Sequence, residues 1–291
     1  MKFNNMKHSL YLILLAVLCW SCNDWLSVSP KSQTKEEDMF ETEEGFKNVL
    51  TGIYTGMCDR ELYGAALTYG AVDVLGGYYE MGYGQMNNIY YTLYQYDYES
   101  TTSLDVIEPI WNKLYNLIAN VNIVLRNVDA QSDVFTEDNY RLCKGEALAL
   151  RAFLHFDLLR IFGKSYVAGA QEEAIPYVEN LELQITPLST VEEVLNKIIR
   201  DLEEAAALME NDPIVTGEAS NLFLGNRQLH INYYGVRALL ARVYLYKGDK
   251  ANALLNAQSV ISSEKYPWTD REEITVAADE SRNRLFMDEV I

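Results

Sequence analysis

The 291-residue chain is poor in the residues on which most enzymes and metal proteins depend. It holds three histidines and four cysteines, and its one CxxC pair, Cys19 and Cys22, lies at the end of the first apolar run. Zinc sites need such ligands at short, regular spacings, so the sequence predicts no metal site. It also has no GxSxG nucleophile motif, no phosphate-binding loop and no dinucleotide-binding fingerprint. We therefore expect a protein that is not an enzyme and that needs no cofactor.

Basic residues are scarce as well. The 24 Lys and Arg stand against 42 Asp and Glu, which gives a formal charge of −18. A chain with this charge repels nucleic acid and anionic membrane surfaces, so we expect no nucleic acid as a partner. The charge is compatible with a neutral ligand or a basic partner. Hydrophobic residues make up 49% of the chain, which is typical of a globular protein and not of a disordered one.

The first apolar run is too short to cross a bilayer. Residues 10–20 give eleven apolar positions, whereas a membrane span needs about 20. The run follows Lys2 and Lys7 and precedes Ser21 and Cys22, which is the arrangement of a bacterial lipoprotein signal. We expect residues 1–21 to be a cleaved signal peptide and Cys22 to be acylated, with palmitate among the chains that anchor it in lipid. Ordinary cleavage, with Cys22 as a bystander, is the alternative.

The segment after the signal is polar and contains Pro30, so residues 22–40 read as a lipidated N-terminus and tether. Two cysteines remain in the rest of the chain, Cys58 and Cys143. An oxidising compartment would allow them to pair, but two thiols so far apart in sequence form no disulfide framework. We expect them to be buried free thiols.

Apolar residues recur every three or four positions through most of the remaining chain, which predicts helices. The predicted helices cover residues 41–57, 106–128, 140–163, 189–209, 232–247 and 250–262. Residues 140–163 are apolar on most faces, which indicates a helix deep in a core that ends at Gly163. The helix over 189–209 opens on a capping box, made by Ser189 with Glu192 or by Thr190 with Glu193.

The last two predicted helices are joined by Gly248 and Asp249 and form a hairpin of tetratricopeptide type. Alanines are expected on the facing sides, namely Ala238, Ala241, Ala251 and Ala257. One such hairpin is not stable alone and must stack on the other helices. Few segments alternate with period two, so the expected fold class is all-α, a tetratricopeptide-like helical bundle with irregular loops.

Four segments, in this order and at ordinary loop spacing, resemble the SusD/RagB family of surface-exposed, glycan-binding lipoproteins of Bacteroidetes. They are WNKLYNLIANVNIVL at 111–125, GEALALRAFLHFDLLRIFG at 145–163, VLNKIIRDLEEAAALM at 194–209 and ALLARVYLYKGDKANALLNAQSVI at 238–261. Residues 146–153 carry the most specific part of the resemblance, which covers residues 22–291. It implies an outer-membrane location with the protein facing outward, anchored in lipid through Cys22.

The resemblance also implies a partner and a role. The partner is a TonB-dependent, SusC-like outer-membrane transporter, and the role is to capture oligosaccharides or polysaccharides for nutrient uptake without chemistry. The family is considerably longer than this chain, and residues 284–291 resemble its mid-chain segment. We expect residues 41–291 to be a C-terminally truncated, N-terminal helical domain of a larger SusD-like fold. The alternative is a helical protein-interaction scaffold, also a lipoprotein of the outer envelope.

The candidate sugar site lies in a stretch rich in tyrosine and glycine. Ten tyrosines occur from Tyr63 to Tyr98, among glycines that predict an irregular loop. Sugar binding needs flat aromatic faces for the C–H faces of the rings and polar groups for the hydroxyls. Within residues 73–88, Glu80 could bind hydroxyls, and the predicted ligand-binding residues are Tyr78, Tyr79, Tyr83, Gln85, Asn87 and Asn88. The alternative is that these tyrosines pack the loop onto the helices.

Four other residues have structural interpretations. Asp73 is expected to anchor the loop by accepting backbone N–H bonds, and Trp111 is expected in the core because it lies on an apolar helix stripe. His155 sits within the most apolar helix and is expected to be buried, hydrogen-bonded and neutral. His230 stands alone in the sequence, without a neighbouring ligand or catalytic partner.

Overall fold

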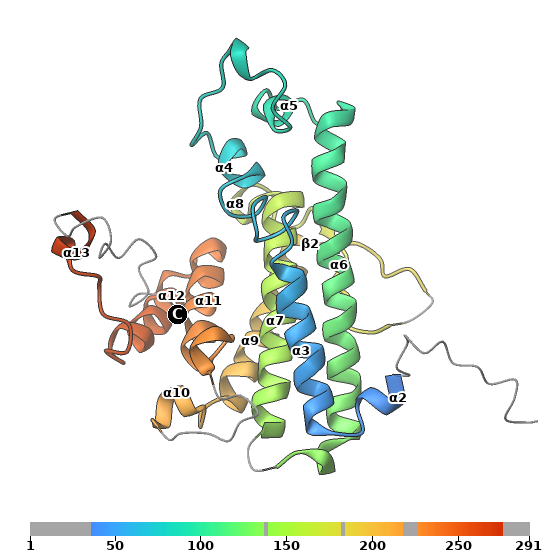
Figure 1. The fold of residues 1–291 in the computed structure, drawn as a ribbon, viewed down its shortest axis with the longest axis vertical. Helices are drawn as coiled ribbons and strands as arrows, with labels where there is room; N and C mark the ends of the chain where they lie inside the picture. The colour runs from blue at the N-terminus through green and yellow to red at the C-terminus, as the bar shows by residue number, and fades with distance from the viewer. Residues whose placement is uncertain (1–35, 137–138, 182–183, 218–225, 276–291) are drawn as a thin grey trace, which may run out of the picture. The chain divides into compact units, whose positions relative to one another are not determined.

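The computed structural model describes residues 36–136, 139–181, 184–217 and 226–275 (Figure 1). The chain falls into two compact units, residues 1–39 and 40–291, and the described part of the first is helix α2 (Glu36–Met39). The predicted signal peptide (1–21), the lipidation site Cys22, most of the tether and residues 284–291 lie outside the described residues. Among the helices that are described, none has the length and apolar character to cross a membrane.

The second unit is built on long helices, as predicted. They are α3 (Glu43–Met57), α6 (Thr101–Ala130), α7 (Asn139–Phe162), α9 (Val191–Leu208), α11 (Tyr233–Lys247) and α12 (Lys250–Ile261). Short helices lie between the long ones: α4 (Ala71–Leu75), η1 (Tyr83–Gln85), α5 (Tyr91–Tyr94), η2 (Ser132–Val134), α8 (Tyr166–Gly169), α10 (Pro213–Thr216) and η4 (Arg227–Leu229). Helix α13 (Arg271–Thr275) follows α12. Strands β1 (Glu173–Ile175) and β2 (Ser189–Thr190) form one small antiparallel sheet. The all-α prediction is confirmed.

Side chains at the helix starts explain where the long helices begin. The Thr42 hydroxyl accepts the Gly45 N–H at 3.2 Å before α3, and the Ser100 hydroxyl accepts the Ser103 N–H at 3.2 Å before α6. At α9 the structure chooses between the two possible capping boxes. The Thr190 hydroxyl accepts the Glu193 N–H at 3.2 Å, and the Glu193 carboxylate accepts the Thr190 N–H at 2.8 Å. Each such cap stabilises a helix by about 1 kcal/mol.

Helix α7 is the centre of the packing (Figure 1). It packs against α6 on one side and α9 on another, α3 lies against α6 and α7, and α11 joins α9 to α12. As its apolar sequence predicts, α7 is buried on nearly every face, but its buried residues include Glu146, Arg151, His155 and Asp157. These polar groups need partners from other helices, because an unpaired buried charge is strongly destabilising.

Three details differ from the predictions. Gly163 follows α7 without a left-handed conformation, and it is glycine because a Cβ there would lie 2.8 Å from the Leu159 carbonyl oxygen. In the α11–α12 hairpin, Gly248 does make the left-handed turn (φ 86°), but Ala251 is exposed and Ala253 is buried in its place. Both cysteines are free thiols, yet only Cys143 is buried, because Cys58 caps the exposed end of α3.

Candidate functional site

The tyrosine-rich stretch lies between α3 and α6 in sequence and includes the short helices α4, η1 and α5 (cyan segment in Figure 1). It consists of turns and very short helices, as its glycine content predicts. Helix α5 connects α4 to the start of α6, where the Ser103 hydroxyl donates to the Thr92 hydroxyl at 2.8 Å. The stretch is therefore attached to the end of a rigid helix while most of its side chains face solvent.

This stretch encloses an open cavity of about 620 Å³. Its lining combines tyrosine rings with one carboxylate and one amide: Val74, Gly77, Tyr78, Tyr79, Glu80, Tyr94, Gln95 and Tyr96. The rings offer flat apolar faces, and the carboxylate and the amide offer acceptors and donors for hydroxyl groups. The cavity has the side-chain chemistry that recognition of a sugar requires.

Backbone contacts fix the shape of the cavity. The Tyr79 hydroxyl donates to the Tyr69 carbonyl at 2.9 Å, and the Tyr96 hydroxyl donates to the Leu75 carbonyl at 3.4 Å. Tyr96 has a φ of 57°, a left-handed conformation that is rare for a residue other than glycine and that often marks functional sites. Asp73 does anchor the loop, but through its backbone carbonyl, which accepts the Tyr78 N–H at 3.0 Å.

Two of the six predicted ligand-binding residues line this cavity. The Tyr78 side chain is 81% exposed and Tyr79 is 42% exposed, so both rings are accessible to a ligand. Glu80 lines the cavity beside them. Tyr94, Gln95 and Tyr96, which the sequence interpretation did not single out, complete it.

The other four predicted residues, Tyr83, Gln85, Asn87 and Asn88, are exposed but lie in and after η1, outside the cavity lining. The Gln85 side-chain oxygen accepts the Gly82 N–H at 3.0 Å, and the Asn88 side-chain oxygen accepts the Tyr90 N–H at 2.9 Å. These two amides thus help to shape the turn.

Tyr63, at the start of the stretch, packs onto the helices in the way that the alternative proposed for Tyr78, Tyr79 and Tyr83. Its ring stacks on Phe153 with centroids 5.2 Å apart, and its hydroxyl donates to Asp157 at 2.9 Å. Burial raises the pKa of Tyr63 well above its usual value. Trp111, predicted in the core, is half-buried and packs edge-on against Phe162 at 4.9 Å.

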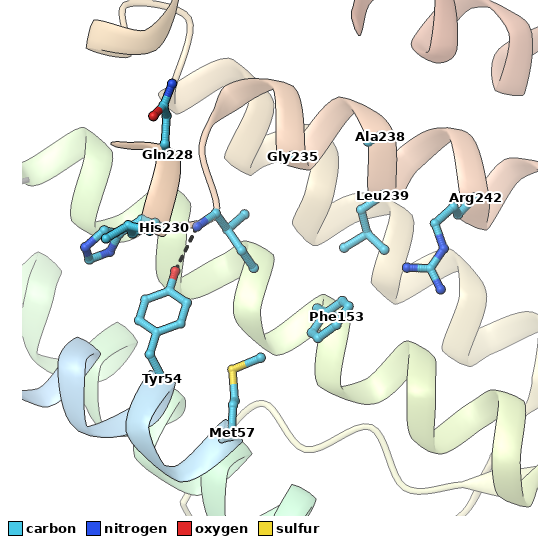
Figure 2. A pocket seen from close by; sticks show the side chains of 11 residues that line it. Tyr54, Met57, Phe153, Gln228, His230, Gly235, Ala238, Leu239 and Arg242 are labelled. Carbon is cyan, nitrogen blue, oxygen red and sulfur yellow. Dashed lines mark hydrogen bonds between the residues drawn. The ribbon is translucent and has the colours of Figure 1, made fainter. Parts of the chain in front are cut away.

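A second cavity, of about 480 Å³, lies between α3, α7 and α11 (Figure 2). Met57, Phe153 and Leu239 supply apolar surface, while His230 and Arg242 supply polar groups. Figure 2 shows Tyr54 directed at the chain that leads into α11, where its hydroxyl accepts the Ile231 N–H at 2.9 Å. Two of the polar residues that line this cavity, Tyr54 and His230, belong to a buried cluster that joins the helices.

That cluster is centred on Glu146 and Arg227, whose side chains are 0% and 3% exposed. Arg227 donates to Glu146 at 2.9 Å and, through Nε and Nη2, to both carboxylate oxygens of Asp212 at 3.0 and 2.9 Å. The Tyr54 hydroxyl and His230 Nδ1 both contact Glu146 Oε1 at 2.7 Å. His230 is thus not alone, as the sequence suggested, since its partner is 84 residues away.

Opposing effects set the charge state of Glu146. Burial on its own raises the pKa of this carboxyl, but the positive charge of Arg227 and the hydrogen bonds from His230 and Tyr54 outweigh it and leave the pKa below its ordinary value of 4.5. The cluster therefore holds a carboxylate in the interior and connects α3, α7 and η4.

A second buried pair connects α7 to α9. Arg151 Nε donates to Asp201 at 2.6 Å, and Arg151 Nη1 donates to Asn122 of α6 at 3.2 Å. Arg151 and Asn122 also line a third cavity of about 610 Å³, together with polar residues such as Glu179 and Asn180. The Tyr177 hydroxyl also donates to Asp201, at 2.6 Å. The polar residues of 146–153 thus hold the scaffold together.

His155 is buried and neutral, as predicted. Its Nε2 accepts the Val178 N–H at 3.0 Å, so the ring proton is on Nδ1, which donates to the Arg151 carbonyl at 2.9 Å. Burial lowers the pKa of His155 to about 3. Within the described ranges, no three His, Cys, Asp or Glu side chains are grouped as metal ligands. Of the three cavities described, the one in the tyrosine-rich stretch is therefore the best candidate site, because exposed aromatic and polar side chains line it.

Comparison with known proteins finds the same scaffold. The SusD-like family model described as "Starch-binding associating with outer membrane" matches residues 24–245. SusD-like protein P38 of Formosa agariphila is 23% identical over 273 residues, which cover 92% of this chain and 48% of that protein. SusD-like protein P2 of the same organism is 22% identical and covers 89% of this chain and 46% of that protein.

Solved structures agree. A SusD superfamily protein from Bacteroides vulgatus superposes with a TM-score of 0.60 at 26% identity, covering 80% of this chain and 50% of that one. A SusD-like carbohydrate binding protein from the same species gives a TM-score of 0.62 at 22% identity, covering 83% and 49%. The chain spans about half the length of the relatives it matches.

Proposed function

Since the chain belongs to the SusD-like family of starch-binding proteins that associate with the outer membrane, we propose that it captures a glycan at the bacterial surface. In this proposal it is a surface-exposed outer-membrane lipoprotein that hands the glycan to a TonB-dependent, SusC-like transporter and performs no chemistry. Acylated Cys22 anchors it in lipid, and residues 41–291 act as the N-terminal helical domain of the family's larger fold. The capture site is the cavity lined by Tyr78, Tyr79, Tyr94 and Tyr96.

The observation that carries the proposal is the exposure of tyrosine rings around a cavity that also holds Glu80 and Gln95. Stacked aromatic pairs gain about 0.5–1.5 kcal/mol beyond the area they bury, and we take the same scale for a sugar's C–H face on each ring. Glu80 accepts hydrogen bonds from hydroxyls, and the Gln95 amide both accepts and donates. Several weak contacts give an affinity that is sufficient for capture and that still permits release to a transporter.

The first test compares two single substitutions in binding to a panel of soluble polysaccharides, measured by affinity electrophoresis and calorimetry. Tyr78→Ala removes an accessible ring from the cavity, and we expect binding to weaken by about two- to tenfold. Trp268→Ala is the matched control, because Trp268 is also an exposed aromatic (83%) and lies outside the cavity. Both variants should melt at the wild-type temperature. Equal effects of the two substitutions would remove the cavity from the proposal.

A third variant tests the rest of the predicted site. Tyr83 is 90% exposed at the start of η1 and outside the cavity lining. If Tyr83→Ala weakens binding as much as Tyr78→Ala does, the binding surface extends to η1 and to the predicted residues Gln85, Asn87 and Asn88. If it has no effect, the site is confined to the cavity.

The anchor and the partner need a separate experiment on the complete, acylated protein in its own membrane. Replacement of Cys22 by Ser should release the protein from the outer membrane, and gentle solubilisation of the wild type should recover a barrel-type transporter with it. Recovery of a soluble envelope protein and no transporter would favour the alternative, an interaction scaffold. The exposed apolar residues Leu254, Leu255 and Ile261 of α12 are the surface that supports this alternative.

A further inference from the structure

The part of the chain that carries the tyrosine cavity contains no basic residue. From residue 61 to residue 112 there is no Lys, Arg or His, although Lys and Arg make up about one residue in ten of the remaining chain. The same 52 residues contain seven acids: Glu61, Asp73, Glu80, Asp97, Glu99, Asp105 and Glu108. Acids are about as frequent there as in the rest of the chain, so it is the absence of bases that leaves seven unbalanced negative charges on the segment that offers the ligand-binding rings.

Three of the acids belong to or adjoin the cavity lining, and the two cations that border the stretch in sequence, Arg60 and Lys113, are outside that lining. Glu80 lines the cavity, and Asp73 precedes the lining residue Val74 in α4 and accepts the Tyr78 N–H through its backbone carbonyl. Asp97 and Glu99 follow the cavity residue Tyr96. At the far border of the stretch, Lys113 is bound by Asp59 at 2.6 Å and by Glu61 at 2.9 Å.

The other bordering cation is Arg60, which lies near Tyr90. Burial raises the pKa of Tyr90, and the positive charge of Arg60 opposes that effect. Tyr90 and Arg60 are outside the cavity lining, and among the described residues that line it there is no Lys, Arg or His. The cavity therefore offers an anionic ligand no partner of opposite charge.

This charge distribution bears on the class of ligand. Proteins that recognise carboxylate or sulfate groups use Arg or Lys, because these supply both charge and aligned N–H donors. Glu80 instead accepts hydrogen bonds, which a sugar hydroxyl can donate and an ionised acid cannot. We propose that the cavity selects uncharged glycans and discriminates against polyanionic ones, that is, sulfated or uronic acid polymers. The inference rests on the proposed glycan-binding function and adds the ligand's charge to it.

The size of the discrimination follows from Coulomb's law. Two like charges about 6 Å apart in water weaken binding about threefold. Glu80 is in the cavity lining, and Asp73 and Asp97 adjoin lining residues in sequence. Several such repulsions give a preference of about tenfold or more at low salt. Salt at 0.5 M or above shortens the screening length to about 4 Å or less, so the preference should shrink there.

The test uses one polysaccharide backbone in three forms, with the intact protein. The forms are a neutral polymer that binds, its carboxymethylated derivative, and its hydroxyethylated derivative, which adds similar bulk without charge. Calorimetry at about 20 mM and about 500 mM salt reports the effect of screening. We expect the neutral and hydroxyethylated forms to bind alike at both salt concentrations. The carboxymethylated form should bind about tenfold more weakly at low salt and recover at high salt.

Charge variants test whether the weaker binding of the carboxymethylated polymer arises from the acids at the cavity. The double variant Asp73→Asn/Glu80→Gln should bind the carboxymethylated polymer several-fold more tightly than the wild type does at low salt. Glu210→Gln makes the same chemical change at an exposed acid outside residues 61–112 and should alter nothing. A melting curve for each variant checks that it is folded.

Each outcome decides something. Binding of no polysaccharide in any form would end the proposed function, and this inference with it. Equal or tighter binding of the carboxymethylated form at low salt would overturn the inference and leave glycan capture standing. Tighter, salt-sensitive binding of a cationic amino-sugar polymer would also overturn it, because the acids would then attract the ligand rather than filter it.

Discussion

Replacement of Arg227 by methionine is the sharpest test of how this fold is held together. Methionine keeps an unbranched side chain of similar length but removes the charge and every donor. Two carboxylates that Arg227 contacts, Glu146 and Asp212, would then remain at 0% exposure without their cation. Removal of one partner from a buried ion pair costs about 3–5 kcal/mol. In a domain of this size we expect the melting temperature to fall by about 6–20 °C.

Lys113→Met is the matched control, since Lys113 also bonds two carboxylates, Asp59 and Glu61, and does so at the surface. Its melting temperature should remain close to that of the wild type, because solvent screens exposed pairs and takes over their hydrogen bonds. Circular dichroism at pH 7 measures both variants. A stable Arg227→Met protein, or an equal loss in the control, would refute the reasoning.

The pH dependence provides a second and independent check. In the wild type the pKa of Glu146 lies below its ordinary value of 4.5, so its stabilising contribution is present above that pH and is lost as the pH falls further. Without Arg227, burial is the largest remaining influence, and we expect it to raise the pKa of the folded carboxyl above its ordinary value. The folded variant then binds a proton that the unfolded chain does not, and acid stabilises it. The gap between variant and wild type should narrow from about pH 7.5 to about pH 5, whereas a gap that widens would contradict this account.

Three further outcomes follow from single residues. Burial lowers the pKa of His155 from 6.5 to about 3, so the contribution of His155 to the unfolding free energy should fall by about 2 kcal/mol between pH 7 and pH 5. Urea titrations should therefore show that the stability of His155→Gln depends less on acid than that of the wild type. Gly52→Ala, in open space on α3, should gain up to about 1 kcal/mol, whereas Gly145→Ala should lose about 1–3 kcal/mol because its Cβ would lie 2.6 Å from a Met209 carbon. A maleimide should label exposed Cys58 in the native protein and buried Cys143 only after unfolding.

The long helices could be predicted because their signals are local. Thr42 and Thr190 lie next to the apolar stripes they cap, and the period of α9 is uninterrupted. Helix α6 starts five residues earlier than predicted, at Thr101, because its first turns carry few apolar residues and Pro109 lies inside it. Where a helix starts without an apolar stripe, its cap sets the boundary, and here that cap is Ser100. Its neighbours also carry hydroxyl groups, so the sequence did not show which residue caps the helix.

The buried polar clusters and half of the cavity could not be predicted, since their partners are remote in sequence. Glu146 meets Arg227 across 81 positions and Arg151 meets Asp201 across 50, and periodicity carries no information about such pairs. Tyr78 and Tyr79 were identifiable from local composition. Tyr96 joins them because its own backbone is left-handed, in a turn that is closed by the bond from its hydroxyl to the Leu75 carbonyl. No pattern of apolar residues specifies the geometry of such a turn.

Different residues account for the stability of the fold and for the proposed ligand binding. Its buried ion pairs join α7 to the helices and loops that pack on it, and substitutions there act on folding. The cavity residues Tyr78, Glu80 and Gln95 are exposed, and the stretch that carries them is attached to the bundle through α5 and α6. Substitutions of these side chains should therefore change glycan affinity while the melting temperature stays constant. The Arg227 variants should show the reverse pattern, with altered stability and, in the folded fraction, unaltered binding.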